Sequence, residues 1–545
     1  MNPSTSGRGS HADRRPAGGG ATRVVAARVR NRTSSLDENV GPREMELVTL
    51  ADWEGREIFA RSAGLVALEA VRRAGRGDAR LGSSWATGRE VVVRGLDAAT
   101  AADLAARATA ELVAMVASGE VLREESWPID DAIELLRGEG QEDAALLLEL
   151  STSPRVALAT CGGRRFPSGG VMVPDARLLD GIALVPHPAG LALDYGVDYA
   201  RELAPRPVAT LMLEVASPRY RAEMTVEEQR WLDLLGITSV GSLTRACVSG
   251  AVRDLVHVAE AFHEKRIANI ADAIRTQSGV RVIAVAGPSS SGKTTFLKRL
   301  AIQLQIIGVR PVTLSLDDYY VDREKTVREP DGTLDFEALE ALDLELLREH
   351  VADLVSGRPV TTARFDFIEG KSHPQGGATL RLGPSDVLLI EGIHALNPAL
   401  LPNVDRDAQF KVFLQPATAL AFDALTTFEP IDLRLVRRIV RDRHDRGYSA
   451  EQSLARWEKV RQGERLRIEA FLSSADRVFD TALVYEIGVL KVFAERYLLE
   501  VPRTSKQFPR ALRLRTLLQP FVPIHPEYVP PNSVLREFIG GSSFR

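Results

Sequence analysis

Cysteine is scarce in this chain of 545 residues, which contains only Cys161 and Cys247. The two residues stand far apart and neither belongs to a Cys-x-x-Cys pair, so the sequence offers no disulfide framework and no zinc ribbon. This usage is typical of a protein in a reducing compartment, and we expect a cytoplasmic location. We also expect each cysteine to be an inert, buried thiol.

Long apolar runs and a surplus of one charge sign are absent as well. No uninterrupted apolar stretch approaches the roughly 20 residues that a membrane-spanning helix needs. The formal net charge is -4 and hydrophobic residues make up 45% of the chain, which is typical of a soluble globular protein without a general attraction to nucleic acid or membrane. At this length we expect two to four domains.

The sequence does contain a run from Val282 to Thr295, VIAVAGPSSSGKTT, in which an apolar stretch leads into glycine, serine and lysine. The run predicts a strand, a phosphate-binding loop and a helix, because TFLKRLAIQLQIIG continues it with helical periodicity. This context makes a chance glycine-serine turn the weaker interpretation. We predict that nucleotide is bound by Gly287, Pro288, Ser289, Ser290, Ser291, Gly292, Lys293, Thr294 and Thr295.

These residue types match the chemistry of a bound triphosphate. Glycines let successive backbone N–H groups close around phosphate oxygens at the positive end of a helix. Lys293 can reach the β- and γ-phosphates and is predicted to be catalytic, and Thr294 offers its hydroxyl to Mg²⁺. We therefore expect ATP, or GTP, and Mg²⁺ as cofactors. A regulatory GTPase is disfavoured because the chain has no Asn-Lys-x-Asp motif.

Composition and periodicity divide the chain into five predicted parts. The Gly-, Ser- and Arg-rich residues 1–45 are expected to form a disordered basic arm. Helical patterns dominate residues 46–150, and short apolar runs in residues 156–195 predict a small antiparallel sheet. The predicted parts are therefore the arm (1–45), an α+β domain (46–235), a helical linker (236–280), a P-loop domain (281–500) and a helical extension (501–545).

Two segments of the α+β domain resemble the editing-associated second domain of threonyl- and alanyl-tRNA synthetases. They read ASGEVLREESWPIDDAIELLRGEGQEDAALLL and CGGRRFPSGGVMVPDARLLDGIALV. The histidine-rich signature of that family would begin at GSSWATGREV, which contains no histidine, and Cys161 alone remains of its metal ligands. We expect neither a zinc site nor editing, but a relic fold used for substrate gating, RNA contact or assembly.

The remainder of the chain, from about His257, resembles uridine kinases of the phosphoribulokinase/uridine kinase superfamily. The resemblance rests on HEKRIANIADAI, AGPSSSGKTTFLKRL, SLDDYYVDRE, DFEALEALDLELL, LLIEGIHALNPAL and LRLVRRIVRDRHDRG, in this order. The whole chain resembles bacterial nucleoside kinases that join a uridine kinase domain to a threonyl-tRNA-synthetase-like module. The fold that this implies is a doubly wound parallel α/β sheet preceded by an α+β domain.

Acidic residues end two of the predicted strands. The strand PVTLS leads into Asp317 and Asp318, at the strand end where α/β sheets bind ligands. Asp317 aligns with the family's catalytic base, which would deprotonate a ribose 5′-hydroxyl, whereas Asp318 would hold Mg²⁺ through water or cap the next turn. Glu391 closes the run DVLLI in the manner of a Walker B carboxylate. We predict Thr294, Glu391 and Asp318 as metal ligands.

On the acceptor side, ARFDFIEGKSH aligns with the uridine kinase segment that contacts the base. Phe365 replaces a tyrosine there, and Gly370 stands where the family has a histidine, so hydrogen bonds that would distinguish pyrimidines are lost. Tyr320 is either a core aromatic or part of the nucleoside wall. Asp335 stands where the family often has an acid that holds the ribose hydroxyls.

A helix rich in arginine is predicted around residues 433–447, and the family places its lid here. A solvated basic stripe is the plainer interpretation of such a helix. We predict Arg437 and Arg441 to be catalytic, Arg434 to bind substrate, and the other arginines to assist.

Together these features predict an enzyme that uses ATP and Mg²⁺ to phosphorylate the 5′-hydroxyl of a nucleoside resembling uridine or cytidine. One alternative is a kinase of another alcohol of the superfamily, such as ribulose 5-phosphate or pantothenate. The other is a nucleotide-gated RNA-binding or assembly protein. Catalysis is favoured over switching because a pure binder needs no acceptor base. We further expect a homo-oligomer and no membrane partner.

Overall fold

The computed structural model describes residues 23–544 apart from residues 30, 39–44, 86, 94, 189, 197–229, 329–331 and 419. The chain divides into two compact units. The N-terminal unit comprises Met1–Ile129, Pro154–Val215 and Ala424–Thr426, and the P-loop unit comprises Asp130–Ser153, Ala216–Asp423 and Thr427–Arg545. Among the described residues, no helix combines the length and the apolar character that crossing a membrane requires.

The N-terminal unit combines antiparallel sheets with helices. Its sheets have the strand orders β2-β1-β3, β4-β5-β10-β9 and β6-β7-β8. Helix α1 forms the middle of its core because most of its apolar segment between Ile58 and Val71 is buried. Helix α2 packs against α1 and ends at Gly119, which adopts a left-handed conformation. The bounds are β1 Val24–Val29, β2 Arg32–Ser34, β3 Glu46–Thr49, α1 Trp53–Arg73, β4 Arg80–Trp85, β5 Gly88–Val92, α2 Ala98–Ser118, β6 Arg123–Pro128, β7 Arg155–Cys161, β8 Arg164–Pro167, β9 Ala183–His187 and β10 Gly190–Asp194.

The prediction of a disordered arm over residues 1–45 is wrong for part of that segment. Strand β1 pairs with both β2 and β3, and Val25 and Ala26 are fully buried in the core of the N-terminal unit. The segment is short and rich in arginine, so its apolar residues showed no sustained period. Residues 1–22 and 39–44 lie outside the described residues. The prediction that helices dominate residues 46–150 also missed the strands β4, β5 and β6, which the structure contains.

The P-loop unit is built on a parallel sheet with the strand order β12-β17-β11-β18-β21. The first strand in sequence, β11, lies in the middle, and later strands are added on both sides of it. This order requires crossover connections, and α9 and α10 lie in two of them. The bounds are α8 Val252–Thr276, β11 Val282–Ala286, α9 Lys293–Ile306, β12 Pro311–Ser315, α10 Leu344–Val355, β17 Val387–Glu391, β18 Gln409–Gln415 and β21 Arg477–Asp480.

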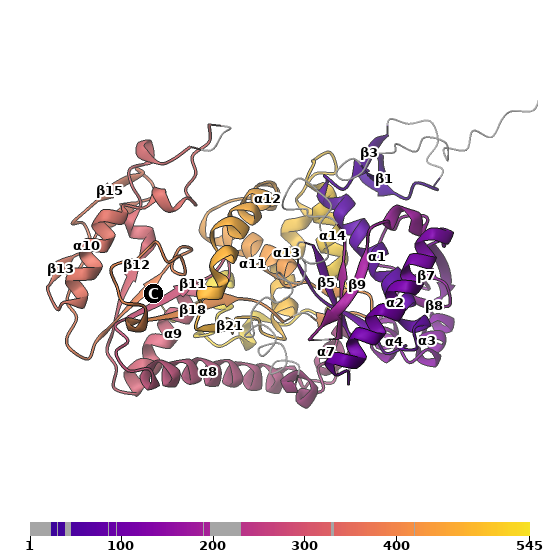
Figure 1. Ribbon diagram of the computed structural model, residues 1–545, viewed down its shortest axis with the longest axis horizontal. Helices are drawn as coiled ribbons and strands as arrows, with labels where there is room; N and C mark the ends of the chain where they lie inside the picture. Colours follow the sequence, from indigo (N-terminus) through magenta and orange to yellow (C-terminus); the bar gives the residue numbers. More distant parts are fainter. Residues whose placement is uncertain are drawn as a thin grey trace, which may run out of the picture. The chain divides into compact units, whose positions relative to one another are not determined.

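Helices cover both faces of this sheet. On one face, Ile270 of α8 and Leu300 of α9 are buried in one cluster with Ile283 of β11. On the other face, Ala284 of β11 belongs to a cluster with Leu347 of α10. Figure 1 shows α8 running beneath the sheet beside α9. The predicted doubly wound parallel fold, preceded by an α+β region, is confirmed, whereas the likeness of that region to a synthetase domain stays a prediction.

Further helices and short strands complete the P-loop unit. The short antiparallel pairs are β13 with β16, β14 with β15, and β19 with β20. The helix bounds are α3 Ile129–Gly138, α4 Glu142–Glu149, α7 Val240–Val248, α11 Pro430–Asp445, α12 Ala450–Arg467, α13 Glu486–Leu499, α14 Phe508–Leu518 and α15 Arg536–Ile539. The strand bounds are β13 Val360–Thr361, β14 Arg364–Asp366, β15 Lys371–His373, β16 Thr379–Leu380, β19 Leu420–Ala421 and β20 Thr427–Phe428.

The predicted linker and the predicted C-terminal extension are both integral parts of the P-loop unit. The linker helices α7 and α8 contribute Val240 and Val256 to the same buried cluster that contains Leu514 and Phe538 of the extension. Helix α4 packs against α7, so residues 130–153 also belong to this unit. The predicted boundaries at residues 235, 280 and 500 are therefore corrected: periodicity marks the helices but not the core into which they pack.

Candidate active site

The loop between β11 and α9 has the backbone of a phosphate cradle. Gly292 precedes the helix with a φ of 88°, and Ser290 has a φ of 61°, a left-handed conformation that non-glycine residues adopt at a cost. A side chain at Gly287 would collide with the carbonyl oxygen of Leu414 on β18. Close packing against the central strands therefore fixes the loop before any ligand binds.

Polar groups of this loop are held ready for an anion. The Lys293 ammonium donates to the carbonyl oxygens of Gly287, at 2.9 Å, and Pro288, at 3.1 Å. The hydroxyls of Ser290 and Ser291 are buried and have no hydrogen-bond partner among the described residues. Burial lowers the pKa of Lys293, and three carboxylates, Glu391, Glu537 and Asp317, act against this shift. Unpaired donors beside a lysine are what a phosphate group would satisfy.

The parallel sheet brings Asp317 and Glu391 to the same edge as Lys293. Strand β17 lies between β12 and β11, Glu391 is its last residue, and Asp317 follows β12 in the 3-10 turn Leu316–Tyr319. The side chain of Asp317 remains accessible to solvent, yet protein surrounds it closely enough that desolvation raises its pKa, against the effect of Lys293. Burial also raises the pKa of Glu391, and Lys293 again opposes it.

The donor set at this edge suits Mg²⁺. Thr294 presents an exposed hydroxyl at the first turn of α9, and the carboxylates of Glu391 and Asp317 share the electrostatic surroundings of Lys293. Hydroxyl and carboxylate oxygens are the hard ligands that Mg²⁺ prefers, with the remaining positions taken by water and phosphate. Thr294 and Glu391 are the residues that would hold the ion, and this role stays a prediction.

The carboxylate of Asp318 is held against β14, and its predicted metal role stays a prediction. A backbone hydrogen bond from Phe365 on β14 stabilises its carboxylate, and Arg364 is the cation beside it, although burial raises its pKa overall. The contact with β14 thus distinguishes Asp318 from its neighbour Asp317. Tyr319, in the same turn, is fully buried and bonds to Nδ1 of His350 at 2.9 Å, as a core aromatic.

Two of the predicted arginines of α11 are structural. Arg437 is fully buried in an ion pair with Glu486 at 2.6 Å and also donates to the carbonyl oxygen of Thr481. Arg434 is ion-paired with Glu464 and donates to the carbonyl oxygen of Ser289. Protein acceptors engage both guanidinium groups, so the predictions that Arg437 is catalytic and that Arg434 binds substrate are corrected.

The next turn of α11 carries the arginines that remain near the loop. Arg438 and Arg441 both donate to the hydroxyl of Ser289, at 3.0 and 3.3 Å, and both contact Asp442. Burial lowers the pKa of each guanidinium, with Asp442 opposing the shift. The structure thus keeps Arg441 as a phosphate-facing candidate and adds Arg438, to which the sequence assigned an assisting role.

Three aromatic rings form a cluster on the acceptor side. Tyr320 lies 5.6 Å from Phe365 and 6.3 Å from Phe367 between ring centroids, and the two phenylalanines are 5.0 Å apart. Phe365 is only 6% exposed, whereas Phe367 is 58% exposed. The ring that is open to a ligand is therefore Phe367, which the sequence did not indicate. Phe365 packs against it in the protein interior.

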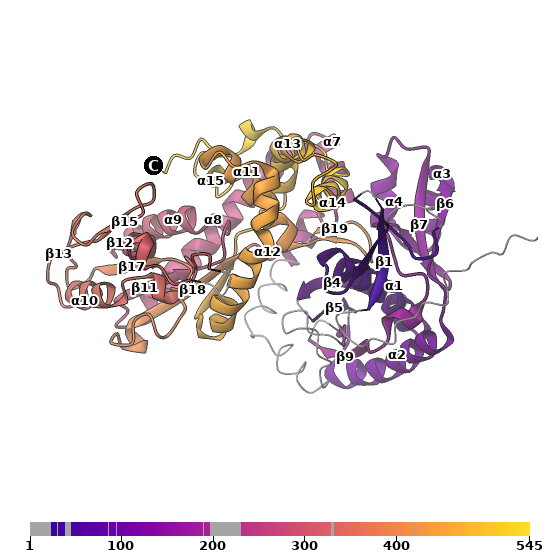
Figure 2. The ribbon, with the colours of Figure 1, turned by 90° about the horizontal axis from the view of Figure 1, so that it is seen from above.

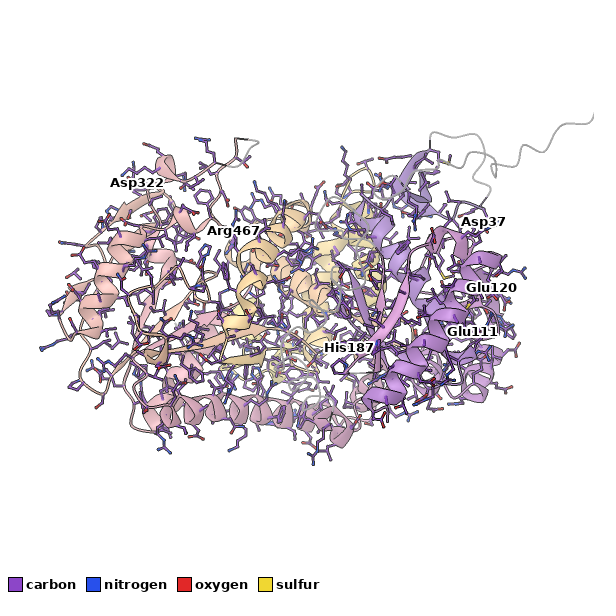
Figure 3. The ribbon with its side chains drawn as sticks, viewed as in Figure 1. Asp37, Glu111, Glu120, His187, Asp322 and Arg467 are labelled. Atoms are coloured by element: carbon purple, nitrogen blue, oxygen red, sulfur yellow. The ribbon has the colours of Figure 1, made fainter. Side chains whose placement is uncertain are left out.

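The predicted ribose ligand Asp335 is already engaged. Its carboxylate pairs with Arg467 at the end of α12, labelled in Figure 3, and accepts the backbone N–H of Glu337 at 3.1 Å. Glu337 lies in the same group: burial raises its pKa to about 7, Glu464 adds to the increase, and Arg467 opposes it. Asp335 thus orders this loop through Arg467, and a contact with ribose stays a prediction.

Gly370 has a structural reason to be glycine. Its φ is 71°, and a Cβ at this position would meet the Arg323 guanidinium at 2.6 to 2.7 Å. Its carbonyl oxygen also accepts the backbone N–H of Arg323 at 2.9 Å. A histidine could not take this place without moving the Arg323 side chain, so the glycine follows from the local turn.

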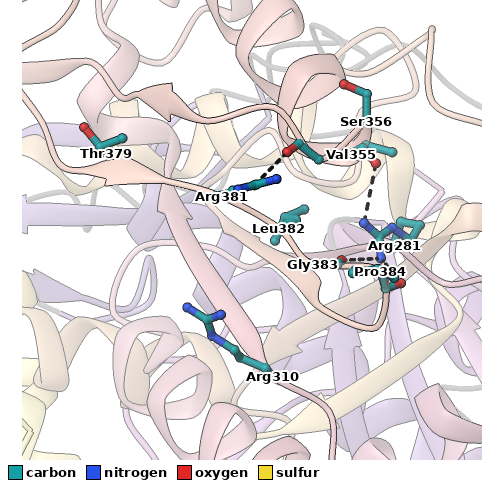
Figure 4. Close-up of a pocket in the computed structure, with 10 residues that line it drawn as sticks. Arg281, Arg310, Val355, Ser356, Thr379, Arg381, Leu382, Gly383 and Pro384 are labelled. Atoms are coloured by element: carbon teal, nitrogen blue, oxygen red, sulfur yellow. Dashed lines mark hydrogen bonds between the residues drawn. The ribbon is translucent and has the colours of Figure 1, made fainter.

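A separate pocket of about 690 Å³ lies at the opposite edge of the sheet (Figure 4). Arg281, Arg310 and Pro384, which line it, stand just before the strands β11, β12 and β17 begin. Figure 4 shows Arg281 and Arg381 directed at backbone carbonyls of the pocket walls. Because nucleotide chemistry belongs to the carboxyl ends of the strands, this pocket is not part of the candidate site.

In the N-terminal unit, Cys161 behaves as the inert thiol that was expected. It is buried, its sulfur lies 3.7 Å from Oε2 of Glu120, and burial raises its pKa to about 12. Cys247, in α7, is partly buried, and desolvation raises its pKa to about 11. Neither sulfur is a thiolate near neutral pH, and neither is a nucleophile.

Comparison with known proteins places the site in a wider group. Residues 282–487 match the model of the phosphoribulokinase/uridine kinase family. A uridine kinase of Staphylococcus haemolyticus is 30% identical over 179 residues, covering 33% of this chain and 76% of that protein. A uridine kinase of Klebsiella pneumoniae is 28% identical over 185 residues, with the same coverage. The solved structure of a "Possible Uridine Kinase" from Bacillus stearothermophilus is 22% identical, with a TM-score of 0.28, covering 40% of this chain and 98% of that one.

Proposed function

This chain belongs to the phosphoribulokinase/uridine kinase family, and we propose that it transfers the γ-phosphoryl group of ATP to the 5′-hydroxyl of a nucleoside. The observation that carries this proposal is the position of Asp317. Its carboxylate lies within electrostatic reach of both Lys293 and Glu391, at the ends of adjacent parallel strands. A protein that only binds nucleotide has no need of a carboxylate opposite the P-loop lysine.

The residues at this edge divide the work of phosphoryl transfer between them. The loop amides and Lys293 hold the phosphate chain, and Arg441 neutralises charge on the transferring group. Thr294 and Glu391 would hold Mg²⁺, which would neutralise negative charge on the phosphate groups. Asp317 accepts the proton of the attacking hydroxyl, and its raised pKa makes it a better base than an ordinary aspartate.

The exposed aromatic ring favours a nucleoside over the other alcohols of the superfamily. Phe367 offers an open face beside Tyr320, and stacking on such a face suits any nucleobase. Ribulose 5-phosphate and pantothenate have no aromatic ring to stack there. Since the hydrogen bonds that Tyr and His supply in the resembling family are absent at Phe365 and Gly370, we propose broad tolerance among nucleobases.

The test measures acceptor-dependent ADP release by the purified full chain. Uridine, cytidine, adenosine, guanosine, ribulose 5-phosphate and pantothenate are compared with Mg·ATP, and the products are identified by mass spectrometry. We expect turnover with nucleosides, and we expect Asp317→Asn to lower kcat by about 100-fold or more while the KM for ATP is kept. The wild-type kcat should fall at acidic pH, with an inflection above the ordinary aspartate range, because only ionised Asp317 accepts a proton.

Asp318→Asn is the matched control, because it makes the same change one residue away on a side chain that faces β14. Its kcat should stay within a few-fold of the wild type. Absence of turnover with every acceptor would refute the kinase proposal. Turnover with ribulose 5-phosphate or pantothenate alone would leave a kinase but exclude the nucleoside.

A further inference from the structure

A carboxylate from the C-terminal segment occupies the first turn of the P-loop helix. Glu537, in α15, accepts the backbone N–H of Thr295 at 3.2 Å and the hydroxyl of Thr295 at 3.0 Å. Thr295 is the third residue of α9, so this N–H is one of the donors that the helix itself leaves unpaired. No sequence pattern signals this contact, because 242 residues separate its partners.

The segment that carries Glu537 is firmly anchored. Phe538 is fully buried and lies under the Arg437 guanidinium, 4.9 Å from the ring centroid. Val534 packs so tightly over Gly292 that a side chain at this glycine would collide with it. Figure 2 shows α15 beside α11, with which it is in contact. The helix is therefore a fixed wall of the site, and the partly exposed Glu537 side chain reaches Thr295 from it.

The position of this carboxylate is one where the proposed nucleotide would place an anion. Donors at the N-terminus of a helix attract phosphate and carboxylate alike, through their N–H groups and the positive end of the helix dipole. Glu537 also acts electrostatically on Lys293, on Arg441 and on Glu391. A triphosphate that reaches Thr295 thus meets a negatively charged carboxylate that already accepts hydrogen bonds from both the N–H and the hydroxyl of Thr295.

We propose that Glu537 is an intramolecular competitor of the nucleotide. Its carboxylate fills the anion position at Thr295 in the free protein and turns away when a phosphate group takes over the two donors, while α15 stays in place. Glu537 thereby sets the nucleotide affinity of the P-loop and keeps Thr295 satisfied between turnovers. This proposal rests on the proposed function only in taking a nucleoside triphosphate as the ligand.

The experiment compares nucleotide binding by the full chain and its variants. Isothermal titration with Mg·ADP and with Mg·ATP is carried out on the wild type, Glu537→Gln and Glu537→Asp. Glutamine keeps the shape but removes the charge, so we expect about tenfold tighter binding, the effect of losing one charge-assisted hydrogen bond to a competitor. Aspartate keeps the charge but loses reach by one methylene, and its affinity should lie between the other two.

Glu527→Gln is the control, because Glu527 is an exposed glutamate of the same C-terminal segment. Its affinity should equal that of the wild type, and circular dichroism verifies that each variant is folded. Wild-type binding that Glu537→Gln leaves unchanged or weakens would overturn the competitor proposal and leave the kinase proposal standing. No binding of either nucleotide by any variant would overturn both.

Discussion

The buried ion pair between Arg437 and Glu486 should be worth more to the stability of the P-loop unit than any exposed pair. The side chains are 0% and 1% exposed, and the guanidinium reaches the carboxylate through two hydrogen bonds, of 2.6 and 3.1 Å. Arg437 also donates to the backbone and hydroxyl oxygens of Thr481, at 2.8 and 3.1 Å. Arg437→Met keeps much of the side-chain volume but leaves Glu486 buried without its cation. Removing one partner of such a pair costs about 3–5 kcal/mol.

Urea unfolding followed by tryptophan fluorescence measures this cost. Two of the five tryptophans, Trp231 and Trp457, belong to the P-loop unit, and Trp457 lies 5.5 Å from the Arg434 guanidinium of α11. A loss of 3–5 kcal/mol should lower the urea midpoint of this unit by about 1 M, since m-values in urea are about 1–3 kcal/mol/M for small proteins and increase with size. The three tryptophans of the N-terminal unit report on its own transition.

The control is Arg443→Met, the same change on the same helix. Arg443 pairs with Glu500 at 3.4 Å, but both side chains are more than a third exposed, so its loss should cost less than about 1 kcal/mol. The double variant Arg437→Met, Glu486→Leu removes both buried charges and should recover most of the stability. The reasoning fails if Arg437→Met costs no more than Arg443→Met, or if the double variant is as unstable as the single one.

Two further predictions concern the acceptor side. Burial holds the pKa of Glu337 at about 7, above its unfolded value, so the folded state binds this proton more tightly and the wild type loses stability as pH rises from 4.5 through 7. The glutamine of Glu337→Gln does not titrate, so the free energy of unfolding of this variant should match that of the wild type near pH 4.5. At pH 8 it should exceed the wild-type value by about 1 kcal/mol, after allowance for partial exposure. A difference in stability that does not depend on pH would contradict the prediction. Phe367→Ala should raise the KM for a nucleoside about tenfold and leave the KM for ATP unchanged. Ile368→Ala, at the more exposed neighbouring residue, should change neither KM, and equal effects of the two variants would argue against stacking.

The central part of the site could be predicted because its determinants are local. The apolar run before Gly287, the glycine-serine loop and the helix after Lys293 are continuous in the sequence, and each favours one backbone conformation. Asp317 and Glu391 follow from a rule of the fold, since acids that end parallel strands meet at one edge of the sheet. A correct assignment of strands was therefore sufficient to bring these residues together.

Roles that depend on tertiary burial were beyond the sequence. Helical spacing places Arg434, Arg437 and Arg441 on related faces of α11, yet Glu464 and Glu486, from later helices, decide which of them are neutralised. The strands β1 and β2 were not predicted, because a short strand that contains arginines shows no recognisable pattern until its partner β3 is known. Periodicity likewise marked α8 as a helix without showing that its apolar face belongs to the core of the P-loop unit.

The arrangement of charge around the loop explains why Arg438 and Arg441, rather than Arg437, stand ready for phosphate. Both donate to the Ser289 hydroxyl, a neutral acceptor that binds an arginine more weakly than a phosphate oxygen does. Arg437 would have to leave the buried carboxylate of Glu486 to reach a ligand, and that exchange would be unfavourable because it leaves Glu486 buried without its cation. Moving Arg438 or Arg441 from a hydroxyl to a phosphate oxygen gains interaction energy and leaves no buried charge unpaired. Asp442 contacts both arginines and limits how far they move. A phosphate at the loop can therefore gain two cationic contacts while the ion pairs of Arg438 and Arg441 with Asp442 are kept.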